Sequence, residues 1–256
     1  MDLWPEGLPN SNGIEKEGYD DQKGNYKPSI QVHLPQSQAP ARCVLVIPGG
    51  AYAGLAIQTE GYNWPPFFNA MGYAAVVLKY RLPRGHDQVP ASDALEAIRQ
   101  IKLHAREWNI DPDGIGVMGF SAGGHLASTV ALQAPDELRP AFQILFYPVI
   151  TMDPKLTHKG THDNLLGKAP SEDMQRKYSG ETQVTPETPR AFIAYASDDT
   201  TVDPLNAIIY YEALKKSGVP ASLHIYPTGE HGFSIHESFR FHLELLENLR
   251  SWLRSF

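Results

Sequence analysis

The chain of 256 residues contains a single cysteine, Cys43. One thiol cannot form an intramolecular disulfide and cannot supply a four-cysteine zinc site. Cys43 opens the apolar run Cys43–Ile47, so we expect a buried strand residue there rather than a reactive thiol. The sequence also lacks a His-Glu-x-x-His motif and a glycine-rich nucleotide loop. We therefore expect no metal and no cofactor.

Long apolar runs and an excess of basic residues are also absent. No stretch reaches the roughly 18 apolar residues that span a bilayer, and the N-terminus has neither the basic region nor the apolar core of a signal peptide. Acidic residues outnumber basic ones, 29 to 22, which gives a net charge of −7. Since nucleic-acid binding needs a basic patch, neither nucleic acid nor a membrane is an expected partner. We expect a soluble protein, either cytoplasmic or a mature secreted or periplasmic chain without its leader.

Apolar runs typical of buried strands alternate with segments of helical periodicity after about residue 28. Several runs are continuously apolar, as in strands that helices cover on both faces. The alternation predicts an α/β fold with a mostly parallel central sheet and helices on both faces. The predicted strands are 30–34, 44–47, 74–79, 115–118, 142–147, 191–196 and 222–226, and the main predicted helices are 92–108, 204–217 and 237–254.

We expect one domain over residues 1–256, with two segments that depart from this rhythm. Residues 1–28 are polar and glycine-rich, which predicts an arm over the domain. Residues 149–189 are polar and contain four prolines, and a connection of this length is usually functional. We predict a small lid or insertion here, between the sixth and seventh main strands, with a short helix near residues 171–178.

Residues 119–123 read Gly-Phe-Ser-Ala-Gly, and this G-x-S-x-G pattern lies between a strand-like run and a helix-like run of small and aliphatic residues. A serine on a sharp turn from strand to helix exposes its Oγ at the end of the sheet. A Cβ at Gly119 or Gly123 would clash with neighbouring backbone, which accounts for both glycines. Ser121 is therefore the predicted nucleophile.

A serine hydroxyl is a weak nucleophile that needs a base, and a carboxylate must orient that base. In a strand–turn–helix setting, the serine, the acid and the histidine follow in that order along the chain. His231 is the predicted base because it lies in a glycine-containing loop directly after the strand-like run 222–226. Asp198 and Asp199 both follow the run 191–196. We favour Asp199, which begins an Asp-x-x-Val spacing, and Asp198 is the alternative.

The tetrahedral intermediate of such a reaction needs hydrogen-bond donors for its oxyanion. The turn Pro-Gly-Gly-Ala-Tyr at residues 48–52 follows the strand-like run 44–47. Its glycines allow backbone N–H groups to face the site, and we predict donors at Gly50 or Ala51. The backbone N–H of Ala122 is the other predicted donor. A plain glycine turn is the structural alternative.

Four segments together resemble the α/β-hydrolase superfamily, and more narrowly its small carbohydrate esterases of the acetyl xylan esterase type. They are residues 48–52, 119–126, 197–199 and 230–233. The opening residues 3–13 and the segment 184–189 are similar to that branch as well. The likeness extends over essentially the whole chain. It departs at Ala51, where the family commonly has a third glycine, and at Pro48, where lipases have histidine.

The resemblance implies an α/β-hydrolase fold with a Ser121–His231–Asp199 triad. It implies a serine esterase acting on short acyl esters of a small molecule or oligosaccharide, such as acetylated xylan. A feruloyl or aryl esterase, a related serine peptidase and a non-catalytic carbohydrate-binding relative are the alternatives. We predict that Tyr52 lines the acyl pocket and consider Trp64 as an aromatic platform for a sugar ring, with burial as its alternative.

His158 and His162 have the i, i+4 spacing of some metal-binding pairs. Their segment contains proline and glycine and shows no helical pattern, so a polar lid loop is the default expectation. The sequence does not indicate an oligomeric state.

Overall fold

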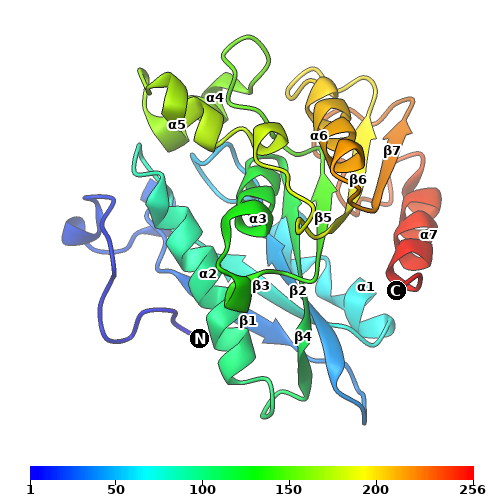
Figure 1. Ribbon diagram of the computed structural model, residues 1–256. Coiled ribbons are helices and arrows are strands. Elements are labelled where there is room, and N and C mark those ends of the chain that lie inside the picture. The colour runs from blue at the N-terminus through cyan, green and yellow to red at the C-terminus, as the bar shows by residue number, and fades with distance from the viewer.

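Seven strands form one sheet in the computed structural model, in the order β1-β3-β2-β4-β5-β6-β7 (Figure 1). Only β1 is antiparallel, and its Ser29 pairs with Lys79 of β3. The strands are β1 (Ser29–His33), β2 (Ala41–Ile47), β3 (Ala74–Lys79), β4 (Ile110–Phe120), β5 (Phe142–Phe146), β6 (Arg190–Ala196) and β7 (Ala221–Tyr226). The predicted, mostly parallel sheet is confirmed.

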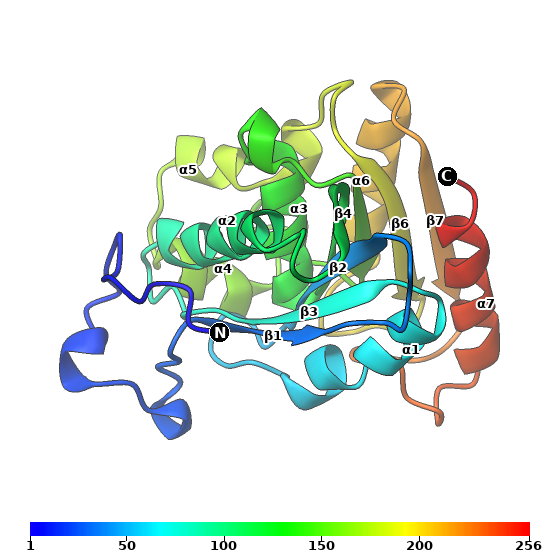
Figure 2. The same cartoon turned by 90° about the horizontal axis from the view of Figure 1, so that it is seen from below.

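Helices cover both faces of the sheet, as the apolar runs predicted (Figure 2). One face carries α1 (Pro65–Ala70) and α7 (His242–Leu253), and the other carries α2 (Gln88–Leu103), α3 (Ser121–Gln133) and α6 (Leu205–Lys216). Short helical turns complete the chain: η1 (Glu15–Glu17), η2 (Asp21–Lys23), η3 (Gln58–Tyr62), η4 (Asp136–Leu138) and η5 (Gly180–Thr182). No helix combines the length and the apolar composition that crossing a membrane requires.

Two helices begin away from their predicted starts, for identifiable reasons. Helix α2 starts at Gln88, four residues early, because Pro90 lies in its first turn, where a proline N–H is not needed. Helix α7 starts at His242 rather than near residue 237. The residues before it form turns that place Phe239 against Phe233, with ring centroids 4.4 Å apart. Tertiary packing of aromatic rings thus overrides local helical periodicity.

The insertion at residues 149–189 connects β5 to β6, so it follows the fifth strand of this sheet, earlier than the predicted place between the sixth and seventh. The five strands predicted before residue 149 are the five observed, so the expected place was one strand too late. The first 28 residues add only isolated bridges, from Asp2 to Ser29 and from Asp20 to Asn25. The insertion contains α4 (Lys159–Leu166) and α5 (Glu172–Lys177), which lie together at the top of Figure 1. Ser171 caps α5 by accepting from the backbone N–H of Met174, so the predicted short helix is confirmed.

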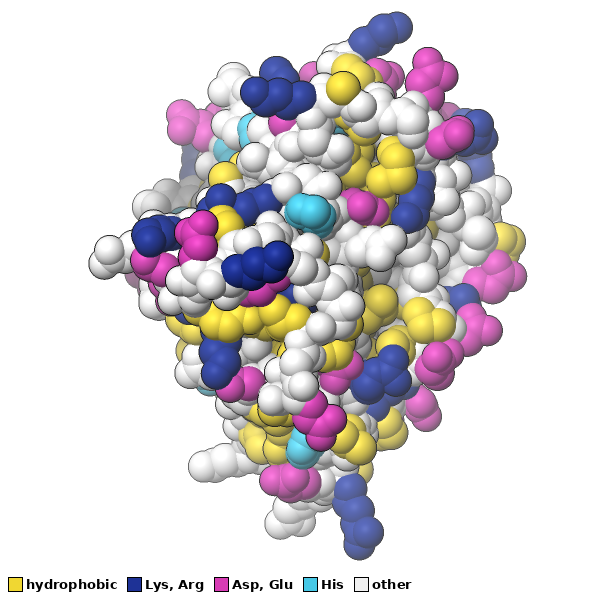
Figure 3. Space-filling view, turned by 90° about the vertical axis from the view of Figure 1, so that its left-hand side faces the viewer, with side chains coloured by type: hydrophobic (Ala, Val, Ile, Leu, Met, Phe, Trp, Pro, Cys, Tyr) yellow, Lys and Arg dark blue, Asp and Glu magenta, His cyan; other side chains and the backbone are white.

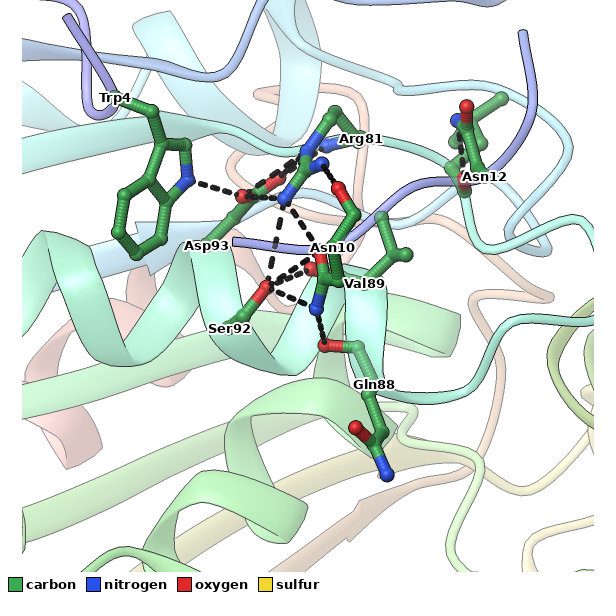
Figure 4. Close-up of polar contacts among 9 residues, drawn as sticks. Trp4, Asn10, Asn12, Arg81, Gln88, Val89, Ser92 and Asp93 are labelled. Carbon is green, nitrogen blue, oxygen red and sulfur yellow. Dashed lines mark hydrogen bonds and ion pairs between the residues drawn. The ribbon is translucent and has the colours of Figure 1, made fainter. Parts of the chain in front are cut away.

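A buried ion pair ties the N-terminal arm to the domain (Figure 4). The side chains of Arg81 and Asp93 are fully buried, and Nη2 of the arginine lies 2.6 Å from Oδ1 of the aspartate. Trp4 donates its Nε1–H to the same oxygen at 2.8 Å, and the backbone carbonyl of Asn10 accepts from Nη1 of the arginine at 2.9 Å. The arm therefore completes the hydrogen bonding of a buried ion pair whose two charges both belong to the domain.

We predict that Asp93→Ala lowers the free energy of unfolding by about 3–5 kcal/mol, because it leaves the buried guanidinium without a counter-charge. The matched control is Glu212→Ala, which removes an exposed i, i+4 partner of Lys216 and should cost about 0.5 kcal/mol or less. Urea unfolding of both variants measures the difference. Equal losses in the two variants would contradict the importance of the buried counter-charge.

Candidate active site

The predicted site residues lie in loops at one edge of the sheet. Strands β2, β4, β5, β6 and β7 are neighbours and parallel, so their carboxyl ends share that edge. The residues that follow these five ends are, in the same order, the turn at 48–52, Ser121, Tyr147, Asp199 and His231. Side chains more than 100 residues apart in the sequence are brought together in this way.

Ser121 occupies a strained backbone position, with a φ of 50°, where β4 meets α3. A Cβ on Gly119 would lie 2.2 Å from the carbonyl oxygen of Gly123, and one on Gly123 would lie 2.3 Å from the carbonyl oxygen of Ile47. No side chain tolerates such contacts with backbone. The predicted steric need for both glycines is confirmed.

His231 makes hydrogen bonds through both of its ring nitrogens. Its Nδ1 lies 2.7 Å from Oδ2 of Asp199, and its Nε2 lies 2.9 Å from Oγ of Ser121. The aspartate side chain is fully buried, and the histidine side chain is 20% exposed. Because a carboxylate only accepts hydrogen bonds, Nδ1 carries the hydrogen and Nε2 presents a lone pair to the serine hydroxyl. This is the tautomer that a general base requires.

Asp199, not Asp198, contacts the imidazole. The second oxygen of Asp199, Oδ1, accepts hydrogen bonds from the backbone N–H groups of residues 201 and 202 at 2.9 and 3.0 Å. Oδ1 of Asp198 instead accepts from the backbone N–H of Glu230 at 2.8 Å. Asp199 is thus fixed for a contact with His231, while Asp198 holds the loop that carries this histidine.

We predict that Asp199→Asn lowers kcat by about 10⁴-fold, because an amide favours the wrong imidazole tautomer. Asp198→Asn should retain kcat within about tenfold, since its amide oxygen can still accept from the backbone of the histidine loop. Steady-state kinetics on 4-nitrophenyl acetate measures both. The reverse ranking would make Asp198 the orienting carboxylate.

The turn after β2 has three consecutive residues with positive φ: Gly50 at 131°, Ala51 at 56° and Tyr52 at 56°. The backbone N–H groups of Gly50, Ala51 and Ala122 donate no hydrogen bond within the chain. The turn lies against the serine, because a Cβ built on Gly49 would be 3.0 Å from Cβ of Ser121. Unpaired donors beside a nucleophile suit an oxyanion. The left-handed conformation of Ala51 is strained, because its Cβ makes this region unfavourable, and glycine would avoid the strain.

The two predicted substrate contacts are buried side chains. Tyr52 is 2% exposed, and its hydroxyl lies 3.0 Å from Nδ1 of His125, so it supports the turn from inside rather than lining an open pocket. Trp64 is fully buried and donates its Nε1–H to Oγ of Ser234 at 3.1 Å. Its ring packs against Phe146 at a centroid distance of 5.1 Å. It offers no face to a sugar, so the platform interpretation is wrong and the burial alternative holds.

His125 joins this turn to the insertion, a role that the sequence analysis missed. Its Nε2 lies 2.8 Å from the carbonyl oxygen of Tyr178, so Nε2 carries the hydrogen and Nδ1 accepts from the hydroxyl of Tyr52. Burial lowers the pKa of His125 to about 4, which keeps the ring neutral near pH 7. The available signal was a polar residue inside the apolar, buried helix α3.

Glu60 was also missed. This carboxylate is 6% exposed, and its Oε2 accepts a hydrogen bond from the backbone N–H of Gly49 at 2.8 Å. Gly49 belongs to the turn at residues 48–52, which we call the oxyanion turn. No motif marks it, because it lies 11 residues after Gly49, outside the turn and its neighbouring motif.

The His158–His162 pair lies at α4, where no helix was predicted. His158 caps this helix by accepting from the backbone N–H of Thr161, and Nδ1 of His162 lies 2.9 Å from Oδ1 of Asp163. No group of three or more potential metal ligands exists in the structure. The helix reaches the site through Asn164, whose side chain donates to the carbonyl oxygen of Ala51 at 2.9 Å.

Comparison with known proteins assigns the class. The α/β hydrolase fold family matches residues 44–235, and the chain belongs to this family. The crystal structure of an acetyl ester-xyloside bifunctional hydrolase from Caldicellulosiruptor lactoaceticus is similar over 100% of this chain and 95% of its own, with a TM-score of 0.86 and 34% identity. The predicted superfamily and fold are confirmed.

Two relatives carry names that refer to xylan. An acetylxylan esterase of Xylanibacter ruminicola is 41% identical over 233 residues, which is 90% of this chain and 48% of the relative. The endo-1,4-beta-xylanase B of Butyrivibrio fibrisolvens is 32% identical over 225 residues, which is 81% of this chain and 35% of the relative. The chain thus spans half or less of the length of these two proteins. The predicted likeness to acetyl xylan esterases is confirmed.

Proposed function

We propose that this protein is a serine esterase that removes short acyl groups, acetyl above all, from carbohydrate esters such as acetylated xylan. The observation that carries the proposal is the continuous hydrogen-bonded path from Asp199 through His231 to Ser121, next to the unpaired backbone N–H groups of residues 50, 51 and 122. Nucleophile, base, orienting acid and oxyanion donors are the complete set that acyl transfer needs.

The first half of the reaction forms an acyl-enzyme. Nε2 of His231 takes the hydroxyl proton of Ser121 as Oγ attacks the ester carbonyl, and Asp199 stabilises the resulting imidazolium. The carbonyl oxygen becomes an oxyanion that backbone N–H groups of the turn and of Ala122 stabilise. The imidazolium then gives its proton to the alcohol oxygen as the C–O bond breaks, and the alcohol leaves.

The second half releases the acid. Nε2 of His231, neutral again, takes a proton from water, and the hydroxide oxygen attacks the acyl carbon. A second tetrahedral intermediate collapses, the bond from carbon to Oγ breaks, and Ser121 recovers its proton from the imidazolium. Every proton transfer in this scheme passes through one ring nitrogen, which explains why Nδ1 must stay bonded to Asp199.

A carbohydrate alcohol is supported by the surroundings of His231. A hollow of about 430 Å³ borders this histidine, and of its eleven lining residues only Phe233 and Phe239 are hydrophobic. Such a surface suits hydroxyl groups better than an alkyl chain. Elsewhere on the molecule, over the face shown in Figure 3, acidic and basic side chains are interspersed. The names of the relatives point to the same substrate class.

We predict that Ser121→Ala folds like the wild type and lowers kcat by about 10⁴-fold or more, because the three residues act as a unit. A fluorophosphonate should label Ser121 of the wild type and should leave the variant unlabelled, as peptide mass spectrometry can measure. Near-normal hydrolysis by the folded variant would remove the proposed nucleophile. Hydrolysis of feruloyl esters or peptides in preference to acetylated oligosaccharides would favour the alternative activities.

We predict that kcat/KM on 4-nitrophenyl esters peaks at two to four acyl carbons and falls beyond about six, since a chain left in water gains none of the ~0.8 kcal/mol per buried CH₂. The apolar pair of the insertion packs on the core, where Leu165 is 1% exposed and Leu166 is partly buried, which leaves little apolar lining for a long chain. A chain-length series measures this. A maximum at eight or more carbons would reveal a deep acyl channel and a lipase-like preference.

A further inference from the structure

A buried carboxylate, that of Glu60, bonds the oxyanion turn at the glycine that also lies against Ser121. Glu60 belongs to the π-helical turn η3, in which the backbone N–H of Tyr62 bonds the carbonyl of Ile57 at 2.8 Å. Such turns recur at functional sites. A Cβ built on Gly49 would be 2.8 Å from Oε2 of Glu60 and 3.0 Å from Cβ of Ser121, so the carboxylate and the serine approach the same glycine.

The second carboxylate oxygen of Glu60 is connected to His231 through Tyr147. Oε1 of Glu60 accepts the hydroxyl hydrogen of Tyr147 at 2.9 Å. The ring of Tyr147, fully buried, packs edge-on against the imidazole of His231 at a centroid distance of 4.8 Å. Ser234, on the loop after the histidine, donates to the carbonyl of Thr59 beside the glutamate at 2.8 Å. Glu60 thus bonds Gly49, which belongs to the oxyanion turn, and Tyr147, which packs against the imidazole of His231.

Few titratable groups surround Glu60 and Tyr147. Burial raises the pKa of the Glu60 carboxyl above its ordinary value, and hydrogen bonds from Gly49 and Tyr147 and the positive charge of His231 offset part of that rise. Burial, and then the charge of Glu60, raise the pKa of Tyr147, so this phenol stays neutral. The other titratable groups that face the pair are Asp199, Tyr80 and His158. Asp199 bonds one side of the imidazole, and Glu60 acts from the buried side.

We infer that Glu60 is a positioning residue of this esterase, which fixes the oxyanion turn through Gly49 and the imidazole of His231 through Tyr147, and which stabilises the imidazolium by its negative charge. The inference rests on the proposed function of Ser121 and His231. It makes Glu60 a second buried carboxylate of the site, acting through other residues and without contact to the reacting atoms.

Glu60→Gln separates charge from shape. The amide oxygen can still accept from the backbone of Gly49, and the amide hydrogen can bond the phenol oxygen of Tyr147, so the packing is retained. The negative charge is lost, and with it part of the preference of the imidazole for its protonated form. We predict that kcat falls about tenfold or more, that KM is little changed, and that the acidic limb of the kcat profile moves to lower pH.

Two controls accompany this variant. Tyr147→Phe keeps the charge and removes the hydroxyl, so kcat should fall about fivefold with the acidic limb unmoved. Glu96→Gln neutralises another buried carboxylate, which bonds Gln100 on α2 at 2.7 Å, and should change neither kcat nor the limb. Circular dichroism establishes that each variant is folded.

An NMR titration of the His231 ring measures the protonation of the imidazole directly, without turnover. Its midpoint should move to lower pH in Glu60→Gln and stay in place in Glu96→Gln. If fluorophosphonate does not label Ser121 of the wild type, the proposed function fails, and the NMR comparison still tests the coupling of Glu60 to His231. An unmoved midpoint, or an acidic limb equal to that of the wild type, would overturn the inference. Should Glu60→Gln not fold, an unchanged kcat in Tyr147→Phe would overturn it.

Discussion

The close approach of two backbone segments is the constraint on which the site depends. The turn at Ser121 packs directly on the end of β2, where a Cβ on Gly123 would lie 2.4 Å from the carbonyl oxygen of Pro48. Only this approach places the serine beside the unpaired N–H groups of the turn at 48–52. The strained φ of 50° at Ser121 is the local consequence, and the packing of the sheet around it holds that strain in place.

Three polar side chains hold the oxyanion turn, and two of them, Glu60 and His125, are buried. Glu60 accepts from the N–H of Gly49, Asn164 donates to the carbonyl of Ala51, and His125 accepts from the hydroxyl of Tyr52. A turn with three positive φ values would relax if these bonds were absent, because strained conformations persist only where the surroundings determine them. The two buried groups are also satisfied at a second atom, Glu60 by the hydroxyl of Tyr147 and His125 by the carbonyl of residue 178. Satisfied networks of this kind favour a single arrangement.

The sequence predicted the parts whose signal is local or follows chain order. Continuous apolar runs marked the parallel strands, and the steric need for Gly119 and Gly123 followed from the motif itself. Chain order selected His231 from several histidines. The contacts of Glu60 and His125 could not be predicted, because each pairs with a group from another element and nothing in its own neighbourhood marks it. Trp64 was ambiguous for a related reason: an aromatic residue before Pro-Pro-Phe-Phe fits a sugar platform and a core equally well until burial is known.

The insertion at residues 149–189 bonds the backbone and side chains of the site, rather than only covering it. Residues 149–189 were expected to act as a lid over the mouth of the site, and their contacts are directed at backbone of the site itself. Asn164 bonds the carbonyl of Ala51, and the carbonyl of Tyr178 accepts from His125. A lid that opens freely would break these bonds and leave a buried histidine unsatisfied, at a cost of about 1–3 kcal/mol for such a group. The hydrogen bonds therefore make the insertion part of the scaffold that shapes the oxyanion turn, rather than a cover that could open without disturbing it.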